Sequence, residues 1–302
     1  MKNILITGGS GQVGTSLQRF GWPGGVNIVA PHRAELDLAN TDSIEAMMNS
    51  RLWAAVINCG ASTAVDRCEA EIVAAWQTNA MAPAALAQAT ARAKIPLIHV
   101  STDYVFGGDK SGTYVETDPV APLGVYGASK EGGEQAIRTA NPRHIIVRTA
   151  WVVSPFGNNF IKTMLRLGAE RPLLRVIDDQ HGCPTDAGDL AAALANITLH
   201  HLQDADAPTG TYHFTNAGQT TWFGLAREIF RIAASLGLKV PELEAITTDQ
   251  YPLPAKRPAN SRLNTDKITR DFGIIPRPWQ EAINDIIETL LGKNSISKGT
   301  AS

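Results

Sequence analysis

The chain has 302 residues, of which 44% are hydrophobic and 19% charged, so it can bury a large core in one or two domains. With 27 Lys and Arg against 29 Asp and Glu, the net charge of −2 gives no basic surplus of the kind that binds nucleic acid. The three cysteines are odd in number and widely spaced, which argues against a disulfide framework and favours a reducing compartment. No stretch is apolar enough for a secretion signal or a membrane span, so we expect a cytoplasmic protein without membrane contacts.

Short apolar runs alternate with helical patterns through the first half of the chain. We predict strands over Asn3–Thr7, Asn27–Pro31, Ala55–Asn58, Leu97–Ser101 and His144–Arg148. Helical spacing occurs over Val13–Phe20, Ser43–Arg51, Ile72–Lys94 and Tyr126–Ala140. Continuous apolar strands separated by helices indicate a parallel sheet covered on both faces, which is the doubly wound, Rossmann-like α/β fold.

The regular alternation of predicted strands and helices ends after residue 150. Helices are predicted over Asn159–Glu170, Asp186–His201, Thr221–Leu236 and Pro278–Leu291, with proline-rich links such as Tyr251–Pro258 between them. We therefore expect a dinucleotide-binding domain over residues 1–150 and a smaller, mainly substrate-binding domain over 151–302, partly interleaved with the first. The small polar residues of 293–302 predict a disordered tail.

A glycine-rich turn follows the first predicted strand. Gly8, Gly11 and Gly14 are spaced three apart at the start of the first helix. Gly8 permits a tight turn, Gly11 lets a pyrophosphate approach the backbone, and Gly14 allows the helix to pack closely on the strand. A glycine triplet alone also fits an ordinary flexible turn, but its place at the first strand–helix junction indicates dinucleotide binding.

The end of the second predicted strand bears on the choice of cofactor. An acidic residue there would bind the adenosine ribose of NAD, but the sequence reads Ala30-Pro31-His32-Arg33. His32 and Arg33 can accept a 2′-phosphate, which favours NADPH, while a solvated Arg33 would leave NADH open. Asp37 and Leu38 follow, in position to meet the adenine edge.

Three residues together predict a site of hydride transfer. Tyr126 and Lys130 stand four apart, on one face of a helix, and Thr102 follows an apolar strand at the edge where α/β sheets bind ligands. A ketone that receives hydride on carbon needs a proton on oxygen, and an ammonium beside a tyrosine lowers the pKa of its hydroxyl. Thr102 can orient the carbonyl. Alone, Tyr126 and Lys130 would also fit an exposed helix pair.

Two arginines in the second half are candidates for binding a diphosphate. Arg257 and Arg262 lie in a proline-rich loop of a nearly neutral chain and can form bidentate hydrogen bonds, although solvated loop charges are the alternative. The seven histidines show no metal-ligand spacing, so no metal site is predicted.

Several longer motifs identify a family resemblance. They are TGGSGQVG at 7–14, HVSTDYVFGG at 99–108, PLGVYGASKEGGE at 122–134, DDQHGCPT at 178–185 and RPANSRLNT at 257–265. Together they resemble the extended short-chain dehydrogenase/reductase superfamily, and within it the dTDP-4-dehydrorhamnose reductase family. The resemblance implies reduction of the C4 ketone of dTDP-4-dehydro-β-L-rhamnose to dTDP-L-rhamnose. Tyr104, which follows Thr102-Asp103 where the related dehydratases carry Glu, fits a plain reduction.

The resemblance also implies roles for individual residues. Thr102, Tyr126 and Lys130 are the expected catalytic residues. The cofactor is expected to contact Gly8, Gly11, Gln12, Val13, Gly14, Asp37, Leu38, Cys59, Gly60, Ala61, Thr63, Tyr126 and Lys130, with Lys130 holding its ribose. The substrate is expected to contact Thr102, Asp103 and Trp151.

Alternatives remain at this stage. The chain could act on another nucleotide-linked ketosugar as a reductase or epimerase, or serve as a non-catalytic dinucleotide-binding regulatory subunit. Some family members dimerise through magnesium held by carboxylates, but the matching places here are Ser16 and Gly188, so magnesium is not expected unless Asp189 supplies a shifted ligand. Both a monomer and a homodimer stay open.

Overall fold

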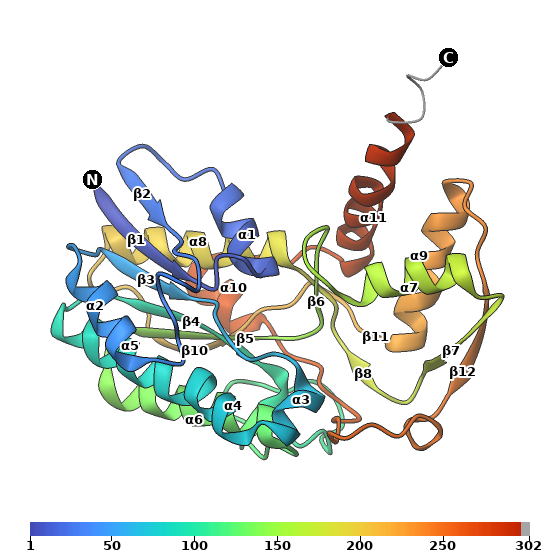
Figure 1. Ribbon diagram of the computed structural model, residues 1–302, viewed down its shortest axis with the longest axis horizontal. Coiled ribbons are helices and arrows are strands. Elements are labelled where there is room, and N and C mark those ends of the chain that lie inside the picture. The colour runs from blue at the N-terminus through green and yellow to red at the C-terminus, as the bar shows by residue number, and fades with distance from the viewer. Residues whose placement is uncertain (297–302) are drawn as a thin grey trace.

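The computed structural model describes residues 1–296, and its centre is one parallel sheet (Figure 1). Six strands lie in the order β10-β5-β4-β3-β1-β2, and every neighbouring pair is parallel. The chain moves outward from β1 in both directions, which leaves a crevice at the carboxyl ends of β1 and β3. The strands are β1 (Lys2–Thr7), β2 (Val26–Val29), β3 (Ala55–Asn58), β4 (Leu97–Thr102), β5 (His144–Thr149) and β10 (Gly210–His213).

Helices cover both faces of this sheet, so the doubly wound fold is confirmed. On one face the packed helices are α1 (Gln12–Arg19), α8 (Ala187–Gln203) and α10 (Asp266–Phe272). On the other face they are α2 (Thr41–Asn49), α5 (Ala82–Arg92) and α6 (Val125–Ala140). The strand side chains between the two layers are buried, which explains why these strands read as continuous apolar runs.

The sheet draws on both halves of the sequence. The five predicted strands of the first half are present within two residues of their expected ends. The sixth strand, β10, was not predicted, because GTYH is short and opens with glycine. Helix α8 and strand β10 both follow residue 150 yet pack on the sheet, so the chain returns to it after building part of a second unit.

The helix predicted over Ile72–Lys94 contains an irregular turn. The structure has α4 (Ile72–Trp76), a π-helical turn η1 (Gln77–Met81) and then α5. The wider turn carries Asn79, which is fully buried. Its amide accepts from the Ser62 backbone N–H at 2.8 Å and donates to Ser129 Oγ at 3.0 Å. The turn therefore ties the loop after β3 to helix α6. A short helix before it, α3 (Val65–Ala70), was not predicted.

The later part of the chain builds a second, smaller unit beside the sheet (Figure 1). Its parallel strands β7 (Leu173–Ile177) and β12 (Glu242–Ile246) pack with α7 (Phe160–Glu170), α9 (Trp222–Ser235) and α11 (Trp279–Ile296) around their own apolar core. Helix α11 continues to Ile296, past the point where we predicted disorder, and the rest of that predicted tail lies outside the described residues.

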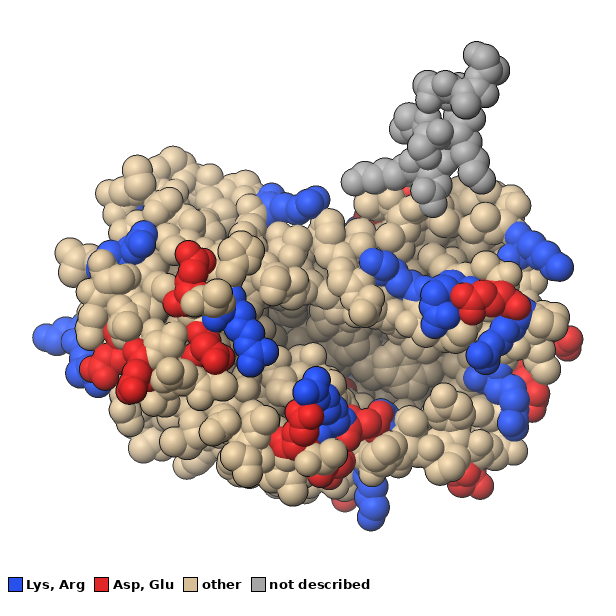
Figure 2. Space-filling model, viewed as in Figure 1, with Lys and Arg blue, Asp and Glu red and all other residues tan. Residues whose placement is uncertain are grey.

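Short elements connect the two parts around a hollow (Figure 2). Strand β6 (Val152–Val153) pairs with β9 (Thr185–Asp186), and β8 (His181–Gly182) pairs with β11 (Thr220–Thr221). The structure also has two 3-10 turns, η2 (Asp103–Val105) and η3 (Thr248–Gln250). Over residues 1–296, no helix has the length and apolar character needed to cross a membrane.

Candidate active site

A cavity of about 610 Å³ lies at the carboxyl ends of the central strands. It opens where the chain reverses its direction across the sheet, which is where α/β folds bind ligands. Most of the predicted site residues line it, from both the glycine-rich turn and the predicted catalytic set: Gly8, Gly11, Gln12, Val13, Gly14, Cys59, Gly60, Ala61, Thr63, Thr102, Asp103, Tyr126, Lys130 and Trp151.

The glycine-rich turn forms a cradle that only glycine can make. Gly8 has a φ of +67°, and a Cβ there would lie 2.6 Å from the Gly60 backbone nitrogen. A Cβ on Gly14 would lie 2.3 Å from the Gly8 carbonyl oxygen. A Cβ on Gly11 would meet only that carbonyl, so the other side of Gly11 is open to the cavity at the start of α1. Bare backbone at a helix N-terminus fits a pyrophosphate.

Cys59 and Gly60 form the wall opposite this cradle. A Cβ on Gly60 would meet Leu38 Cδ1 at 2.3 Å, so Leu38 packs behind the wall without lining the cavity. Burial raises the pKa of the Cys59 thiol to about 12, which favours the protonated thiol at neutral pH.

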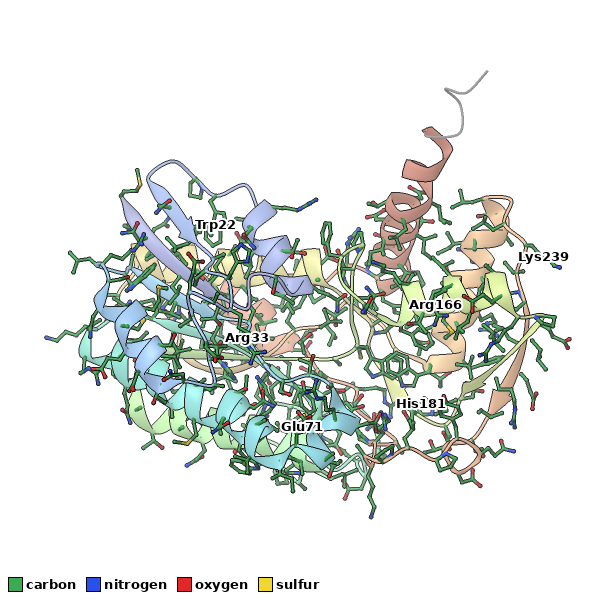
Figure 3. All side chains as sticks on the ribbon, in the orientation of Figure 1. Trp22, Arg33, Glu71, Arg166, His181 and Lys239 are labelled. Carbon is green, nitrogen blue, oxygen red and sulfur yellow. The ribbon has the colours of Figure 1, made fainter. Side chains whose placement is uncertain are left out.

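The residues predicted to select the cofactor lie outside the lining of this cavity. Arg33 is in the loop after β2 (Figure 3), and its side chain is 85% exposed, with Nε 3.6 Å from an Asp37 carboxylate oxygen. His32 lies in the same loop, where its backbone N–H donates to Glu35. A role for His32, Arg33, Asp37 and Leu38 toward the adenosine end of a cofactor stays a prediction.

Thr102 and Tyr126 reach the cavity from two different elements. Thr102 ends β4, is 5% exposed, donates its hydroxyl to Asp103 Oδ1 at 3.0 Å and accepts from the Tyr104 N–H at 3.2 Å. Tyr126 stands in the first turn of α6 and contacts the Tyr104 ring edge-to-face, with centroids 5.5 Å apart. Both residues therefore line one cavity, and their catalytic roles stay a prediction.

The electrostatics differ from the expectation in one respect. Burial raises the pKa of Tyr126, and hydrogen bonding with the Thr102 side chain opposes this rise. Lys130 is not among the groups that shift this pKa. Its Nζ instead donates to the Val100 carbonyl at 2.7 Å, and burial lowers the pKa of Lys130 itself to about 8. The lysine is therefore a group that can exchange a proton near neutral pH.

A buried polar chain behind Lys130 was not predicted. Thr7, Asn58 and His99 have no exposed surface and lie on the adjacent strands β1, β3 and β4. The Thr7 hydroxyl donates to Asn58 Oδ1 at 2.5 Å, the Asn58 amide nitrogen lies 2.8 Å from His99 Nδ1, and His99 Nε2 lies 3.3 Å from Lys130 Nζ. The signal in the sequence was a polar residue directly after ILI (Thr7), directly after AVI (Asn58) and inside LIHV (His99).

Two further polar groups face the cavity without full pairing. Burial raises the pKa of Asp103 to about 6, so near neutral pH its carboxyl can be a hydrogen-bond donor or an acceptor. Thr149 Oγ1 is buried with no hydrogen-bond partner among the described residues, and Thr149 lines the cavity. A bound ligand with hydroxyl groups would satisfy both.

Trp151 and Trp222 separate this cavity from a second one. Trp151 has a φ of +47°, and its ring stacks on Trp222 with centroids 3.6 Å apart. Trp222 also lines the second cavity, of about 550 Å³, in the smaller unit. The lining of that cavity is mostly apolar with arginines at its margin: Phe160, Met164, Leu167, Arg171, Leu174, Arg175, Val176, Tyr251, Leu253 and Arg257.

The two predicted diphosphate arginines have partners within the protein. Arg257 lines the second cavity, but its guanidinium pairs with the Asp66 carboxylate, with contacts of 2.7 and 3.1 Å. Arg262 donates to Asn260 at 2.7 Å and to Gln219 at 2.8 Å and lines neither cavity. Arg257 thus lies near a ligand site with its charge largely balanced, and a diphosphate contact by either arginine stays a prediction.

Gln12 connects the glycine-rich turn to the chain beyond β5. Its Oε1 accepts from Ser154 Oγ at 2.8 Å and from Asn159 Nδ2 at 2.9 Å. Gly157 and Asn158, between those two residues, line the cavity. The side chain of Gln12 therefore orders a loop over the cradle, a contact that spacing alone could not predict.

The candidate magnesium ligand Asp189 is occupied by protein donors. Its Oδ2 accepts from Arg277 Nε at 2.7 Å and from Asn216 Nδ2 at 2.6 Å. Within residues 1–296 no group of three or more acidic, cysteine or histidine side chains is arranged to hold a metal ion.

Comparisons with known proteins bear directly on this site. The pattern of the RmlD substrate binding domain matches residues 1–291. The dTDP-4-dehydrorhamnose reductase of Aggregatibacter actinomycetemcomitans is 43% identical over 289 residues, which cover 95% of this chain and 98% of that protein. The chain belongs to the dTDP-4-dehydrorhamnose reductase family. The family resemblance inferred from the motifs is therefore confirmed.

Solved structures of dTDP-4-dehydrorhamnose reductases share the fold. The Clostridium acetobutylicum structure superposes with a TM-score of 0.89 at 36% identity, covering 96% of this chain and 99% of its own. The Bacillus anthracis structure, solved in complex with NADP, gives a TM-score of 0.87 at 33% identity, covering 96% of this chain and 100% of its own. The likeness extends over both the sheet and the smaller unit.

Proposed function

We propose that this chain catalyses the NADPH-dependent reduction of the C4 ketone of dTDP-4-dehydro-β-L-rhamnose, giving dTDP-L-rhamnose. The observation that carries the proposal is the meeting of Tyr126, Thr102 and Lys130 in one cavity with a glycine cradle. Family membership supports the substrate, because relatives that match along nearly the whole chain are named for this reaction.

The proposed roles follow from position and chemistry. When bound, NADPH supplies the hydride that reaches the sugar carbon. The Tyr126 hydroxyl donates the proton that the sugar oxygen then requires, and the Thr102 hydroxyl orients that oxygen. Asp103 and Trp151 line the same cavity and are proposed to contact the sugar.

The cofactor is proposed to lie along the cradle of Gly8, Gly11 and Gly14. The free face of Gly11 and the start of α1 fit the pyrophosphate. The B. anthracis relative was solved with NADP, which supports NADPH over NADH. Residues 1–150 are proposed as the main cofactor-binding part, and residues 151–302 as the main substrate-binding part.

The second cavity is proposed to receive the nucleotide of the dTDP-sugar. It adjoins the first across Trp222, and its apolar lining with Arg171 and Arg175 at the margin fits a base and a phosphate. A sugar nucleotide could then span both cavities past the Trp151–Trp222 stack.

Loss of NADPH absorbance at 340 nm is the direct test. The purified protein is mixed with NADPH and dTDP-4-dehydro-6-deoxyglucose, with and without the 3,5-epimerase that sets the rhamnose configuration. Oxidation that depends on the epimerase is the expected result. Tight NADPH binding without oxidation would overturn the substrate assignment and point to another nucleotide-linked ketosugar or to a regulatory subunit.

A further inference from the structure

Only one direction of hydrogen bonding along the chain from Thr7 to Lys130 gives the Thr7 hydroxyl proton an acceptor. The Thr7 hydroxyl donates to Asn58 Oδ1 at 2.5 Å. Among the described residues Thr7 donates to no other acceptor, while its oxygen accepts from the Gly60 N–H at 3.2 Å. Turning the Asn58 amide around would leave the buried Thr7 hydroxyl unpaired, which is costly.

The amide of Asn58 then fixes the tautomer of His99. Its nitrogen donates to His99 Nδ1 at 2.8 Å, so that ring nitrogen carries no proton. Burial lowers the pKa of His99 well below its usual value, so the ring is neutral. A neutral imidazole has one N–H, and here it must be at Nε2.

The Nε2–H group points at Lys130 Nζ, 3.3 Å away. An ammonium has three donors and no acceptor, so only the neutral amine of Lys130 can accept this hydrogen bond. The amine still donates to the Val100 carbonyl at 2.7 Å. Of the other titratable groups facing Lys130, Cys59 at the end of β3 is protonated, and Glu134 on α6 favours the ammonium.

We propose that His99, held in one tautomer by Thr7 and Asn58, is a positioning residue that holds the Lys130 amine and lets Lys130 give up its proton during the reduction. The proposal rests on the proposed function. After Tyr126 passes its hydroxyl proton to the sugar oxygen, the proton that re-forms the phenol comes from the Lys130 ammonium across the cavity that both residues line. The N–H bond breaks as the O–H bond re-forms, and the amine that remains fits the His99 Nε2–H. A solvent proton then restores the ammonium.

The test replaces His99 by asparagine. In His99→Asn the new Oδ1 can still accept from Asn58, but nothing donates to Lys130. The pKa of Lys130 should therefore rise by about one unit, since a lost hydrogen bond of ordinary strength corresponds to a shift of that size. Titration of lysine Cε carbon-13 signals by NMR reads this pKa without cofactor or substrate, and Lys130→Arg assigns the signal.

The matched control is His144→Asn. His144 lies on the neighbouring strand β5, and its ring contacts the Asn141 carbonyl at 2.6 Å, with no hydrogen bond to Lys130 among the described residues. This variant should leave the Lys130 titration unchanged. If His99→Asn does not fold, Thr7→Val releases the Asn58 amide and should give a smaller upward shift.

The outcomes separate the two proposals. An unchanged or lowered pKa of Lys130 in His99→Asn would overturn the role of His99, whatever the activity. A merely structural role would lower the melting temperature and kcat at every pH without moving the titration. If activity is present, the basic limb of the kcat profile should move upward with the NMR value. Failure of the wild-type protein to oxidise NADPH would overturn the proposed function instead.

Discussion

The two sides of the cavity are built on different physical principles. On the sheet side, the hydroxyl of Thr102 and the amine of Lys130 line the cavity, and a buried hydrogen-bonded chain through His99 lies behind the amine. The side of the smaller unit presents apolar surface and a pair of stacked indoles, Trp151 and Trp222. Groups that transfer protons need a fixed geometry and low solvent exposure, whereas a bulky ligand is bound mainly through the surface area that it buries. The difference predicts that changes on the sheet side alter turnover and that changes on the other side alter affinity.

The largest expected effect is loss of the proton donor on the sheet side. Tyr126→Phe should lower kcat about 10³-fold, in the range that general acid catalysis contributes, while NADPH affinity stays close to the wild-type value. NADPH oxidation and nucleotide fluorescence measure the two quantities. Tyr212→Phe, which removes a hydroxyl from β10 on the sheet edge, is the control. Full activity in Tyr126→Phe would refute the assignment of the donor.

An intermediate effect is expected from breaking the indole stack. Trp222→Ala should raise the KM for the sugar nucleotide about tenfold, the value of an aromatic pair, and leave kcat and NADPH affinity nearly unchanged. Trp222→Phe loses the Nε1–H bond to Gln180 at 3.2 Å but keeps a ring against Trp151. Because the ring contact remains, the KM of this variant should change less than that of Trp222→Ala. A fall in kcat at constant KM would show that the smaller unit takes part in the chemistry. It would contradict the division between a sheet side that sets turnover and a smaller unit that sets affinity.

The smallest effect is expected at the ion pair that joins the two sides. Asp66→Asn should lower the free energy of unfolding by about 0.5 kcal/mol, because the Asp66–Arg257 pair is partly exposed. Glu170→Gln, in the more exposed pair with Arg166 on α7, should cost less. Urea unfolding curves measure both differences.

The same ion pair makes a pH-dependent contribution. The hydrogen bond from Arg257 lowers the pKa of Asp66 in the folded state, so its stabilising effect is complete above the pKa of the unfolded carboxyl. It is lost as the pH falls through the lower folded value. The difference between wild type and Asp66→Asn should therefore be constant near neutral pH and vanish in acid. A difference that grew on acidification would contradict this sign.

The sequence predicted the sheet side far better than the other side. The strands around Ile4 and Ile98 are continuous apolar runs, and the residue after such a run lies at a known edge of the sheet, so Gly8 and Thr102 could be placed without contacts. The Tyr126–Lys130 spacing added a helix face. These are local rules, and they apply because both sheet faces are buried.

The rest depends on long-range contacts that spacing does not encode. The Trp151–Trp222 stack joins residues about seventy positions apart, and the Arg257–Asp66 pair joins the last quarter of the chain to the first. Sequence reasoning left Arg257 free for a phosphate because nothing near it in the chain carries the opposite charge. His99 was overlooked for a similar reason, since its partners Asn58 and Lys130 come from other elements.

The π-helical turn over Gln77–Met81 makes the length of this segment as important as its composition. Its wider coil holds one residue more than an α-helix would, and that residue count turns Asn79 inward toward Ser62 and Ser129. Deleting one residue here would restore an ordinary helix but rotate Asn79 by about 100° away from both serines. Over evolution, this stretch should therefore tolerate exchanges of residue type more readily than insertions or deletions.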